Sequence, residues 1–217
     1  MINELEMNLN DIFLNDIFLF DVDDTLLYTF QNGFLKINAA AQEYGYSPIT
    51  FDEYRSCYGR YSFEECLRIW FPSCNVERLS RCYSEQKSKF PYKPICDFGV
   101  LQKKLMDRGI QCGILTNGHN NKKLFEKLLL SGVILSDLIG VWGKEDLPFP
   151  KPDSRALLPV KKLYPSGKLV YFGDAVTDYQ MCREGNIAFV QVLSGKESAI
   201  SNVISIRDIT ILLEYLP

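Results

Sequence analysis

The sequence predicts an α/β protein in which a Rossmann-like parallel sheet carries helices on both faces and is interrupted by an all-helical insertion. Short apolar runs of strand length alternate with helical stretches of about ten to fifteen residues, which implies right-handed crossovers between parallel strands. No strand signal occurs between residues 33 and 91, and the 217-residue length favours one domain with a sizeable insertion. We therefore expect a core domain over residues 1–28 and 92–217 and a helical domain over 29–91.

The composition limits the possible partners and the compartment. A net charge of -3 offers no broad cationic field for a nucleic-acid backbone or an anionic membrane, so neither partner is expected. The seven cysteines are odd in number and form no C-x-x-C pair, which indicates free thiols in a reducing environment. No window approaches the roughly 18 apolar residues of a membrane span. We expect a cytoplasmic protein.

The first predicted strand lies in the second copy of a short tandem repeat. The sequence NDIFL occupies residues 10–14 and again residues 15–19. The second copy continues into Phe20, and the apolar run Ile17–Phe20 has the length and the aromatic character of a buried strand. The first copy has no such continuation, so we interpret it as an accidental duplication or an edge strand.

The insertion has three helical signals. Apolar residues recur on one face from about residue 33, and Gly45 can end that helix. Ser62 and Glu65 form a capping-box pattern ahead of a second apolar stretch. A third helix is expected over residues 76–90, where Pro91 closes it.

After Pro94 the pattern alternates between helix and strand. The predicted strands cover residues 110–115, 138–142, 169–172, 187–190 and 203–204. The predicted helices lie before Gly109, from Asn120 or Asn121 to Ser131, from Asp153 to Tyr164 despite Pro159, and from Asp208 to Leu216.

Unusual polar residues follow the ends of these strands. They occur at positions 21–25, 116–118 and 173–178, and Lys151-Pro152 precedes the helix that begins near Asp153. Ligands bind beyond the carboxyl ends of parallel strands, so these residues should share one edge of the sheet. Clustered carboxylates repel one another unless a cation lies among them, and Mg²⁺ suits oxygen ligands. The pattern therefore predicts a magnesium site.

Such a site suits phosphoryl chemistry. A carboxylate at the end of a strand can attack phosphorus and form an aspartyl phosphate, which water then hydrolyses. A metal and a lysine would neutralise the transferring group, while backbone N–H groups and a threonine hydroxyl would hold its oxygens. A second carboxylate two residues further on would point toward the leaving oxygen, where a general acid is required.

Four motifs resemble those of the haloacid dehalogenase-like (HAD) phosphohydrolase superfamily in order and spacing. They are Asp21-x-Asp23-x-Thr25, Thr116, Lys151-Pro152 and Gly173-Asp174-x-x-x-Asp178. The resemblance covers about residues 16–195. The inserted helices resemble the helical cap of the phosphoglycolate phosphatase-like subgroup.

The resemblance implies a catalytic role for four residues. Asp21 would be the nucleophile, and Asp23 would be the general acid and base. Thr116 would bind phosphoryl oxygens, and Lys151 would pair with both the nucleophile and the phosphate.

It also implies a set of metal ligands. The Asp21 carboxylate, the Asp23 backbone carbonyl and Asp174 would bind Mg²⁺. Asp178 would act through metal-bound water or by orienting Lys151, and Thr25 would support the nucleophile loop.

The predicted substrate-binding residues are Thr116, Asn117 and Arg60. Arg60 lies in the segment Tyr58-Gly59-Arg60-Tyr61, where family members place a loop over the active site. Its planar fork could bind a substrate carboxylate or a second phosphate, and a solvated linker arginine is the simpler alternative.

Two other residues near the motifs have simple interpretations. Asp24 stands where the family frequently has Gly, and we expect an exposed or capping loop residue there rather than a third catalytic acid. His119, the single histidine, is expected at the exposed start of a helix, with contact to a leaving group as the alternative.

The predicted function is Mg²⁺-dependent hydrolysis of a small phosphorylated metabolite of the phosphoglycolate, sugar phosphate or nucleotide type. The alternatives are a phosphomutase or another transfer enzyme of the superfamily, and a non-enzymatic receiver-like phosphorylation switch. A receiver resembles this pattern less well, because receivers lack both the Asp21-x-Asp23 turn and the helical insertion.

Overall fold

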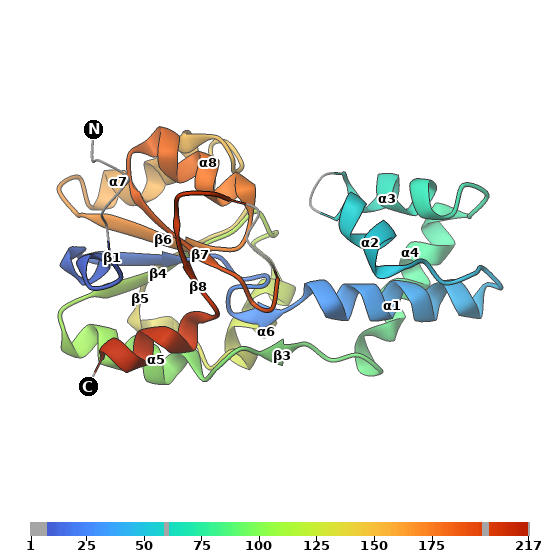
Figure 1. Cartoon of the computed structure of the whole chain (residues 1–217), viewed down its shortest axis with the longest axis horizontal. Helices are drawn as coiled ribbons and strands as arrows, with labels where there is room; N and C mark the ends of the chain where they lie inside the picture. Colours follow the sequence, from blue (N-terminus) through green and yellow to red (C-terminus); the bar gives the residue numbers. More distant parts are fainter. Residues whose placement is uncertain (1–7, 59–60, 197–199, 217) are drawn as a thin grey trace. The chain divides into compact units, whose positions relative to one another are not determined.

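The computed structural model describes residues 8–58, 61–196 and 200–216. The chain divides into two compact units (Figure 1). The core unit comprises Met1–Tyr28 and Lys93–Pro217, and the helical unit comprises Thr29–Tyr92. The helical unit therefore ends one residue beyond the expected Pro91.

The core unit is built on a six-stranded sheet in which every neighbouring pair is parallel, so the predicted α/β fold is confirmed. The strand order is β5-β4-β1-β6-β7-β8. The strands are β1 (Ile17–Phe20), β4 (Gln111–Leu115), β5 (Leu138–Trp142), β6 (Leu169–Gly173), β7 (Ala188–Val192) and β8 (Ile204–Ile206).

The register of the central strands determines which residues share the carboxyl edge. Phe20, the last residue of β1, lies opposite Ile114 of β4 and Phe172 of β6. The residues that follow these strands therefore emerge side by side. The edge of the sheet thus brings together the three segments that carry Asp21, Thr116 and Asp174.

The apolar residues of β1 pack on both faces of the sheet, as expected for a central parallel strand. Phe18 and Phe20 are fully buried on one face, where the Phe20 ring lies 4.9 Å from that of Phe98. Ile17 and Leu19 join the cluster on the other face. Each buried aromatic or aliphatic side chain stabilises the fold by about 2 kcal/mol.

Helices cover both faces (Figure 1). Those of the core unit are α5 (Phe98–Asp107), α6 (Lys122–Leu130), α7 (Leu158–Leu163) and α8 (Val176–Gly185). Asn121 caps α6 by accepting from the N–H groups of Lys123 and Leu124, which confirms one of the two predicted caps.

Three core segments differ from the expected elements. The expected helix over 153–164 is a 3-10 helix, Ser154–Leu157, followed by α7, and Pro159 lies in the first turn of α7, where its missing N–H is harmless. The C-terminal segment Ile209–Tyr215 is also a 3-10 helix. The first NDIFL copy is neither a strand nor an edge, because Asp11–Leu14 forms a 3-10 helix that buries Ile12.

A short antiparallel pair was not predicted. It joins β2 (Leu27–Tyr28) to β3 (Lys93–Pro94), at the points where the chain leaves and re-enters the core unit. Two residues per strand are too few to produce an alternating pattern in the sequence.

The helical unit contains α1 (Phe30–Glu43), α2 (Phe51–Cys57), α3 (Phe63–Trp70) and α4 (Val76–Glu85), followed by a 3-10 helix, Gln86–Ser88. The predicted capping box of Ser62 and Glu65 begins α3. Thr50 and Glu53 form a second capping box at α2, a helix that the sequence reasoning missed although the same pattern is present. Ile37, Ala41 and Leu67 are fully buried within this unit.

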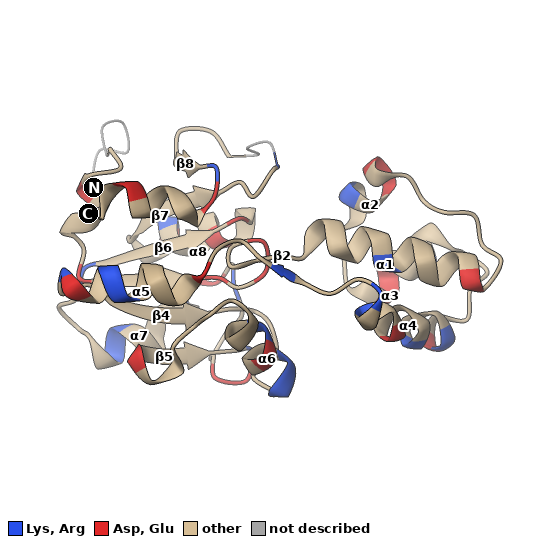
Figure 2. Cartoon of the chain, turned by 90° about the horizontal axis from the view of Figure 1, so that it is seen from below, with Lys and Arg blue, Asp and Glu red and all other residues tan. Residues whose placement is uncertain are grey.

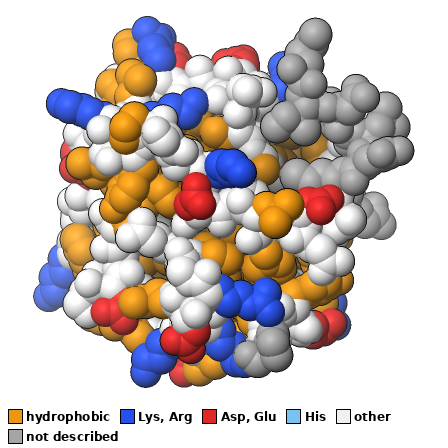
Figure 3. Space-filling model, turned by 90° about the vertical axis from the view of Figure 1, so that its left-hand side faces the viewer, with side chains coloured by type: hydrophobic (Ala, Val, Ile, Leu, Met, Phe, Trp, Pro, Cys, Tyr) orange, Lys and Arg blue, Asp and Glu red, His pale blue; other side chains and the backbone are white. Residues whose placement is uncertain are grey.

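Charges of both signs are interspersed along the helices of both units (Figure 2), in keeping with the net charge of -3. On the face shown in Figure 3, apolar side chains lie among charged and other polar groups. No helix in the described part of the chain combines the length and the apolar character that a membrane crossing requires.

Candidate active site

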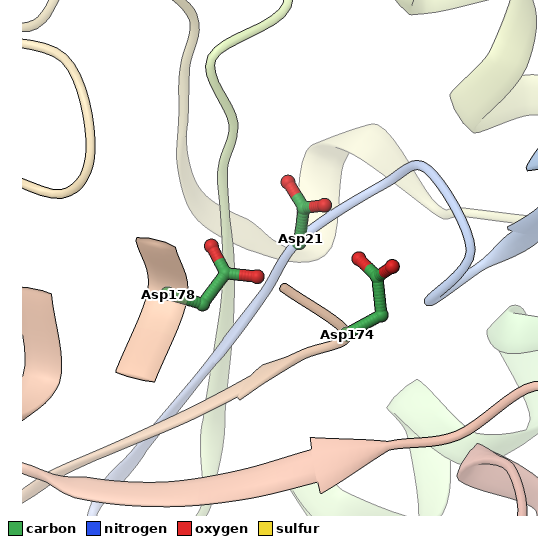
Figure 4. Close-up of side chains that lie close together, drawn as sticks. All are labelled: Asp21, Asp174 and Asp178. Atoms are coloured by element: carbon green, nitrogen blue, oxygen red, sulfur yellow. The ribbon is translucent and has the colours of Figure 1, made fainter. Parts of the chain in front are cut away.

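Three carboxylates converge at the carboxyl edge of the sheet (Figure 4). Asp21 follows β1, Asp174 follows β6, and Asp178 lies in the first turn of α8. Each offers one carboxylate oxygen, and these oxygens lie within 4.8 Å of one another. The Asp21 N–H donates to the carbonyl of Phe172 at 2.9 Å, so the ladder between β1 and β6 fixes the backbone at Asp21.

The Lys151 ammonium lies between two of these carboxylates. Its Nζ is 2.9 Å from Asp21 Oδ1 and 2.6 Å from Asp178 Oδ1. It also donates to the Tyr171 hydroxyl at 2.8 Å, and that hydroxyl donates to the Leu115 carbonyl at 2.6 Å. Burial by itself lowers the pKa of Lys151, but Asp178 and Asp21 outweigh this effect and raise it above the usual range. Lys151 therefore remains an ammonium.

The carboxylates are short of positive charge. The pKa of Asp21 is raised to about 6, because burial, together with Asp178 and Asp23, outweighs the opposing effect of Lys151. Burial likewise raises the pKa of Asp174 to about 7, with Lys196 acting in the opposite direction. A cation that binds among such carboxylates favours their ionised forms. This all-oxygen donor set fits a hard divalent cation such as Mg²⁺.

Gly173 makes room for Asp178. A Cβ at position 173 would lie 2.3 Å from Asp178 Oδ2 and 2.7 Å from its Cγ. The same Oδ2 accepts from the N–H of Ala175 at 3.1 Å, so the carboxylate cannot retreat without losing this bond. Glycine at this position is therefore required by close approach rather than by backbone conformation.

We expect Gly173→Ala to lower the free energy of unfolding by about 1–3 kcal/mol, because the added methyl group overpacks a buried site. Urea denaturation would measure the change. Gly118→Ala is the matched control, since a Cβ there meets only ordinary contacts, the nearest at 3.5 Å from Thr116 Oγ1. Equal stability of the Gly173→Ala variant and the wild type would contradict the expected clash.

Thr116 and Asn117 follow β4 at the same edge. The Thr116 hydroxyl accepts from the Gly118 N–H at 3.1 Å. Asn117 donates from Nδ2 to the Lys151 carbonyl and accepts from the Lys151 N–H on Oδ1, both at 2.9 Å. The Asn117 amide thus holds the Lys151 backbone, and the predicted contact of Asn117 with substrate stays a prediction.

Two lysines contact the acidic motif, and sequence reasoning missed both. Lys127 of α6 lies 2.6 Å from Asp23 Oδ1. Lys196, in the loop after β7, lies 2.7 Å from Asp174 Oδ2 and 2.9 Å from Asp24 Oδ2. Neither lysine belongs to a motif with fixed spacing, so nothing in the sequence marks them out.

The expectation that Asp24 is exposed was wrong. Asp24 is only 3% exposed, and its backbone has a φ of 55°, in the left-handed region that Asp tolerates better than most residues. The ion pair with Lys196 explains why a carboxylate can be buried here.

The remaining predicted residues lie in different settings. Thr25 is fully buried, and its hydroxyl has no hydrogen-bond partner among the described residues. His119 is exposed just before α6 and pairs with Glu145, as expected for a surface residue. Arg60 lies outside the described residues.

A covered parallel sheet thus carries a lysine and several carboxylates at its carboxyl edge, in the order of the four motifs. Residues 18–192 match the haloacid dehalogenase-like hydrolase family. The chain therefore belongs to this family, and the resemblance carried by the four motifs is confirmed. No match was found among curated protein sequences.

Solved structures share the fold over nearly the whole chain. A HAD-superfamily hydrolase of subfamily IA from Geobacter sulfurreducens has a TM-score of 0.70 at 18% identity, covering 94% of this chain and 97% of its own. A candidate β-phosphoglucomutase from Thermotoga maritima has a TM-score of 0.73 at 17% identity, with coverages of 93% and 100%. A predicted phosphoglycolate phosphatase from Haemophilus somnus has a TM-score of 0.73 at 14% identity, with coverages of 94% and 98%. These identities show the fold alone.

Proposed function

We propose that this protein is a Mg²⁺-dependent phosphatase that hydrolyses a small phosphorylated metabolite through an aspartyl-phosphate intermediate. The observation that carries the proposal is the placement of Asp21, whose buried carboxylate contacts the Lys151 ammonium at 2.9 Å and precedes Asp23 by two residues. The phosphatase and phosphoglucomutase names of structural neighbours also support a phosphorylated substrate.

In the first half-reaction, a carboxylate oxygen of Asp21 attacks phosphorus, and the bond from phosphorus to the leaving oxygen breaks. Asp23 donates its proton to that oxygen, so an alcohol departs. The Lys151 ammonium compensates negative charge on the transferring group, because Asp21 and Asp178 hold it at the reacting oxygens. The Thr116 hydroxyl and nearby N–H groups bind the phosphoryl oxygens.

In the second half-reaction, Asp23 accepts a proton from water, and the resulting nucleophile attacks the phosphorus of the aspartyl phosphate. The phosphorus–Asp21 bond breaks, which releases inorganic phosphate and restores the carboxylate. Lys127 lies 2.6 Å from Asp23 Oδ1 and would hold this carboxyl group in position for both proton transfers.

The Asp21 and Asp174 carboxylates and the Asp23 backbone carbonyl would hold Mg²⁺, which supplies charge neutralisation for the phosphoryl group. Of the two roles expected for Asp178, orientation of Lys151 has the direct support of a 2.6 Å contact. The helical unit would act as the cap that selects the substrate, and Arg60 remains a predicted contact within it. The seven free cysteines favour the expected cytoplasmic location.

Release of phosphate from p-nitrophenyl phosphate tests the proposal. We expect turnover with Mg²⁺ and its loss in EDTA, because Asp21 and Asp174 bring carboxylate oxygens within 4.8 Å of one another, where a divalent cation would neutralise them and the phosphoryl group. Addition of Mg²⁺ beyond the chelator should restore the rate. Full turnover in EDTA would contradict metal dependence.

A second assay separates hydrolysis from phosphoryl transfer. Phosphate release and formation of a rearranged phosphate ester should be followed together on a panel of phosphorylated metabolites. A phosphatase releases phosphate in proportion to the substrate consumed. Consumption without phosphate release would favour the phosphomutase alternative, and a stable phosphoprotein without turnover would favour the phosphorylation switch.

A further inference from the structure

Lys196 occupies a position that the proposed reaction does not use. Its ammonium contacts one oxygen of Asp174, a proposed metal ligand, at 2.7 Å. It also contacts Asp24 at 2.9 Å. The Lys196 side chain is 26% exposed, whereas the side chains of Asp24 and Asp174 are 4% and 14% exposed. A lysine that reaches inward to two nearly buried carboxylates lies beside the proposed metal site itself.

The charges of the site show what this lysine changes. Among the described residues, five carboxylates contact three ammonium groups in the ion pairs of the site, which leaves two negative charges for a divalent cation. The carboxylates are those of Asp21, Asp23, Asp24, Asp174 and Asp178, and the ammonium groups are those of Lys127, Lys151 and Lys196. Asp24 and Lys196 add one charge of each sign, so together they leave this balance unchanged.

We propose that Lys196 competes with the divalent cation for Asp174 and that Asp24, which shares the ammonium, moderates this competition. The inference rests on the proposed function, which makes Asp174 a metal ligand. In the metal-free protein, the ammonium compensates Asp174 and prevents two buried carboxylates from repelling each other. When a cation binds to Asp174, the cation and the Lys196 ammonium are two positive charges on one carboxylate. Their repulsion weakens binding of the cation. The affinity for the metal is thereby held below the value that the carboxylates alone would give.

Calorimetric titration of the full chain with Mg²⁺, in the absence of substrate, tests this inference. We expect Lys196→Met to bind Mg²⁺ roughly tenfold more tightly than the wild type, a change of about 1.4 kcal/mol. Lys196→Arg keeps the charge and should bind as the wild type does. Asp24→Asn should bind Mg²⁺ more weakly than the wild type. The double variant with Asp24→Asn and Lys196→Met should return toward the wild-type affinity, because it loses one negative and one positive charge.

Lys104→Met is the matched control. The Lys104 ammonium is also engaged, but it donates to the carbonyl of Leu216 at 2.7 Å and not to a carboxylate of the site. Its loss should leave Mg²⁺ affinity unchanged. Thermal unfolding in EDTA gives a second measurement, in which Lys196→Met should melt below the wild type and recover that difference when Mg²⁺ is added. Lys196→Gln serves both measurements if the methionine variant does not fold.

Weaker or unchanged Mg²⁺ binding by both Lys196→Met and Lys196→Gln would overturn the inference. Weaker binding would show instead that Lys196 orients Asp174 for the metal. A wild type that binds no divalent cation would also overturn it. Failure of the proposed function can be told apart from failure of this inference. If the variants bind Mg²⁺ in the expected order of affinities but the wild type releases no phosphate, only the proposed phosphatase activity is refuted.

Discussion

Asp21→Asn is expected to abolish phosphate release, with a loss of at least roughly 10⁴-fold in kcat, because the nucleophile of a covalent mechanism acts as a unit with its partners. The amide oxygen is a poor nucleophile and a poor metal ligand. The substitution also leaves the Lys151 ammonium with only one of its two carboxylate partners, Asp178. Steady-state hydrolysis of p-nitrophenyl phosphate and acid quenching of the phosphoenzyme measure the two consequences.

The control for this variant is Asp153→Asn. Asp153 is also in the core unit and also pairs with a cation, Arg155 at 2.6 Å, but at the surface. The Asp153→Asn variant should retain wild-type turnover. Circular dichroism should show that both variants are folded. Appreciable turnover by a folded Asp21→Asn protein, with phosphate still trapped on the chain, would place the nucleophile at another residue.

Asp23→Asn should slow turnover by roughly 10² to 10⁴-fold, the usual contribution of a positioned acid or base. The first half-reaction should depend on the leaving group. An alkyl phosphate requires a proton on its departing oxygen, whereas p-nitrophenolate departs without one. We therefore expect Asp23→Asn to slow phosphoenzyme formation far more with the alkyl ester than with p-nitrophenyl phosphate.

Rapid-quench measurement of phosphoenzyme formation on both esters would test this dependence. The wild type provides the reference ratio of the two rates, and Asp153→Asn should reproduce it. An equal loss on both esters would show that Asp23 does not protonate the leaving group. A full rate on both would assign proton transfer to a different residue.

The sheet and the motif residues were predictable because both depend on local pattern and on strand order. The apolar run Ile17–Phe20 indicated a central strand, and parallel pairing then required the residues after β1, β4 and β6 to meet at one edge. Asp21, Asp174 and Asp178 do converge there. Spacing along the chain was sufficient for these residues, since each follows directly from the end of a strand or the start of a helix.

Lys127 and Lys196 could not be predicted in the same way. Lys127 reaches Asp23 from a helix 104 positions away, and Lys196 reaches Asp24 from a loop 172 positions away. An isolated lysine in such a segment usually lies in solvent. The burial of Asp24 was missed for the same reason, because it depends on a partner 172 positions away.

The helix α2 was missed for a different reason. Thr50 and Glu53 carry the same capping pattern that was recognised at Ser62 and Glu65, so the information was present in the sequence. The 3-10 geometry of Ile209–Tyr215 was not available from the sequence, because side-chain periodicity barely separates the two helix types over so few residues.

The two hydrogen bonds between the Asn117 amide and the Lys151 backbone join the loop after β4 to the loop that carries the lysine. Thr116 and Lys151, which the proposed reaction brings to the phosphoryl group from different parts of the chain, are thereby linked. A substitution that changes the position of Lys151 must also disturb Thr116, because Asn117 connects their loops. Evolutionary diversification of this enzyme should therefore leave these two loops unchanged as a pair and concentrate in segments outside them.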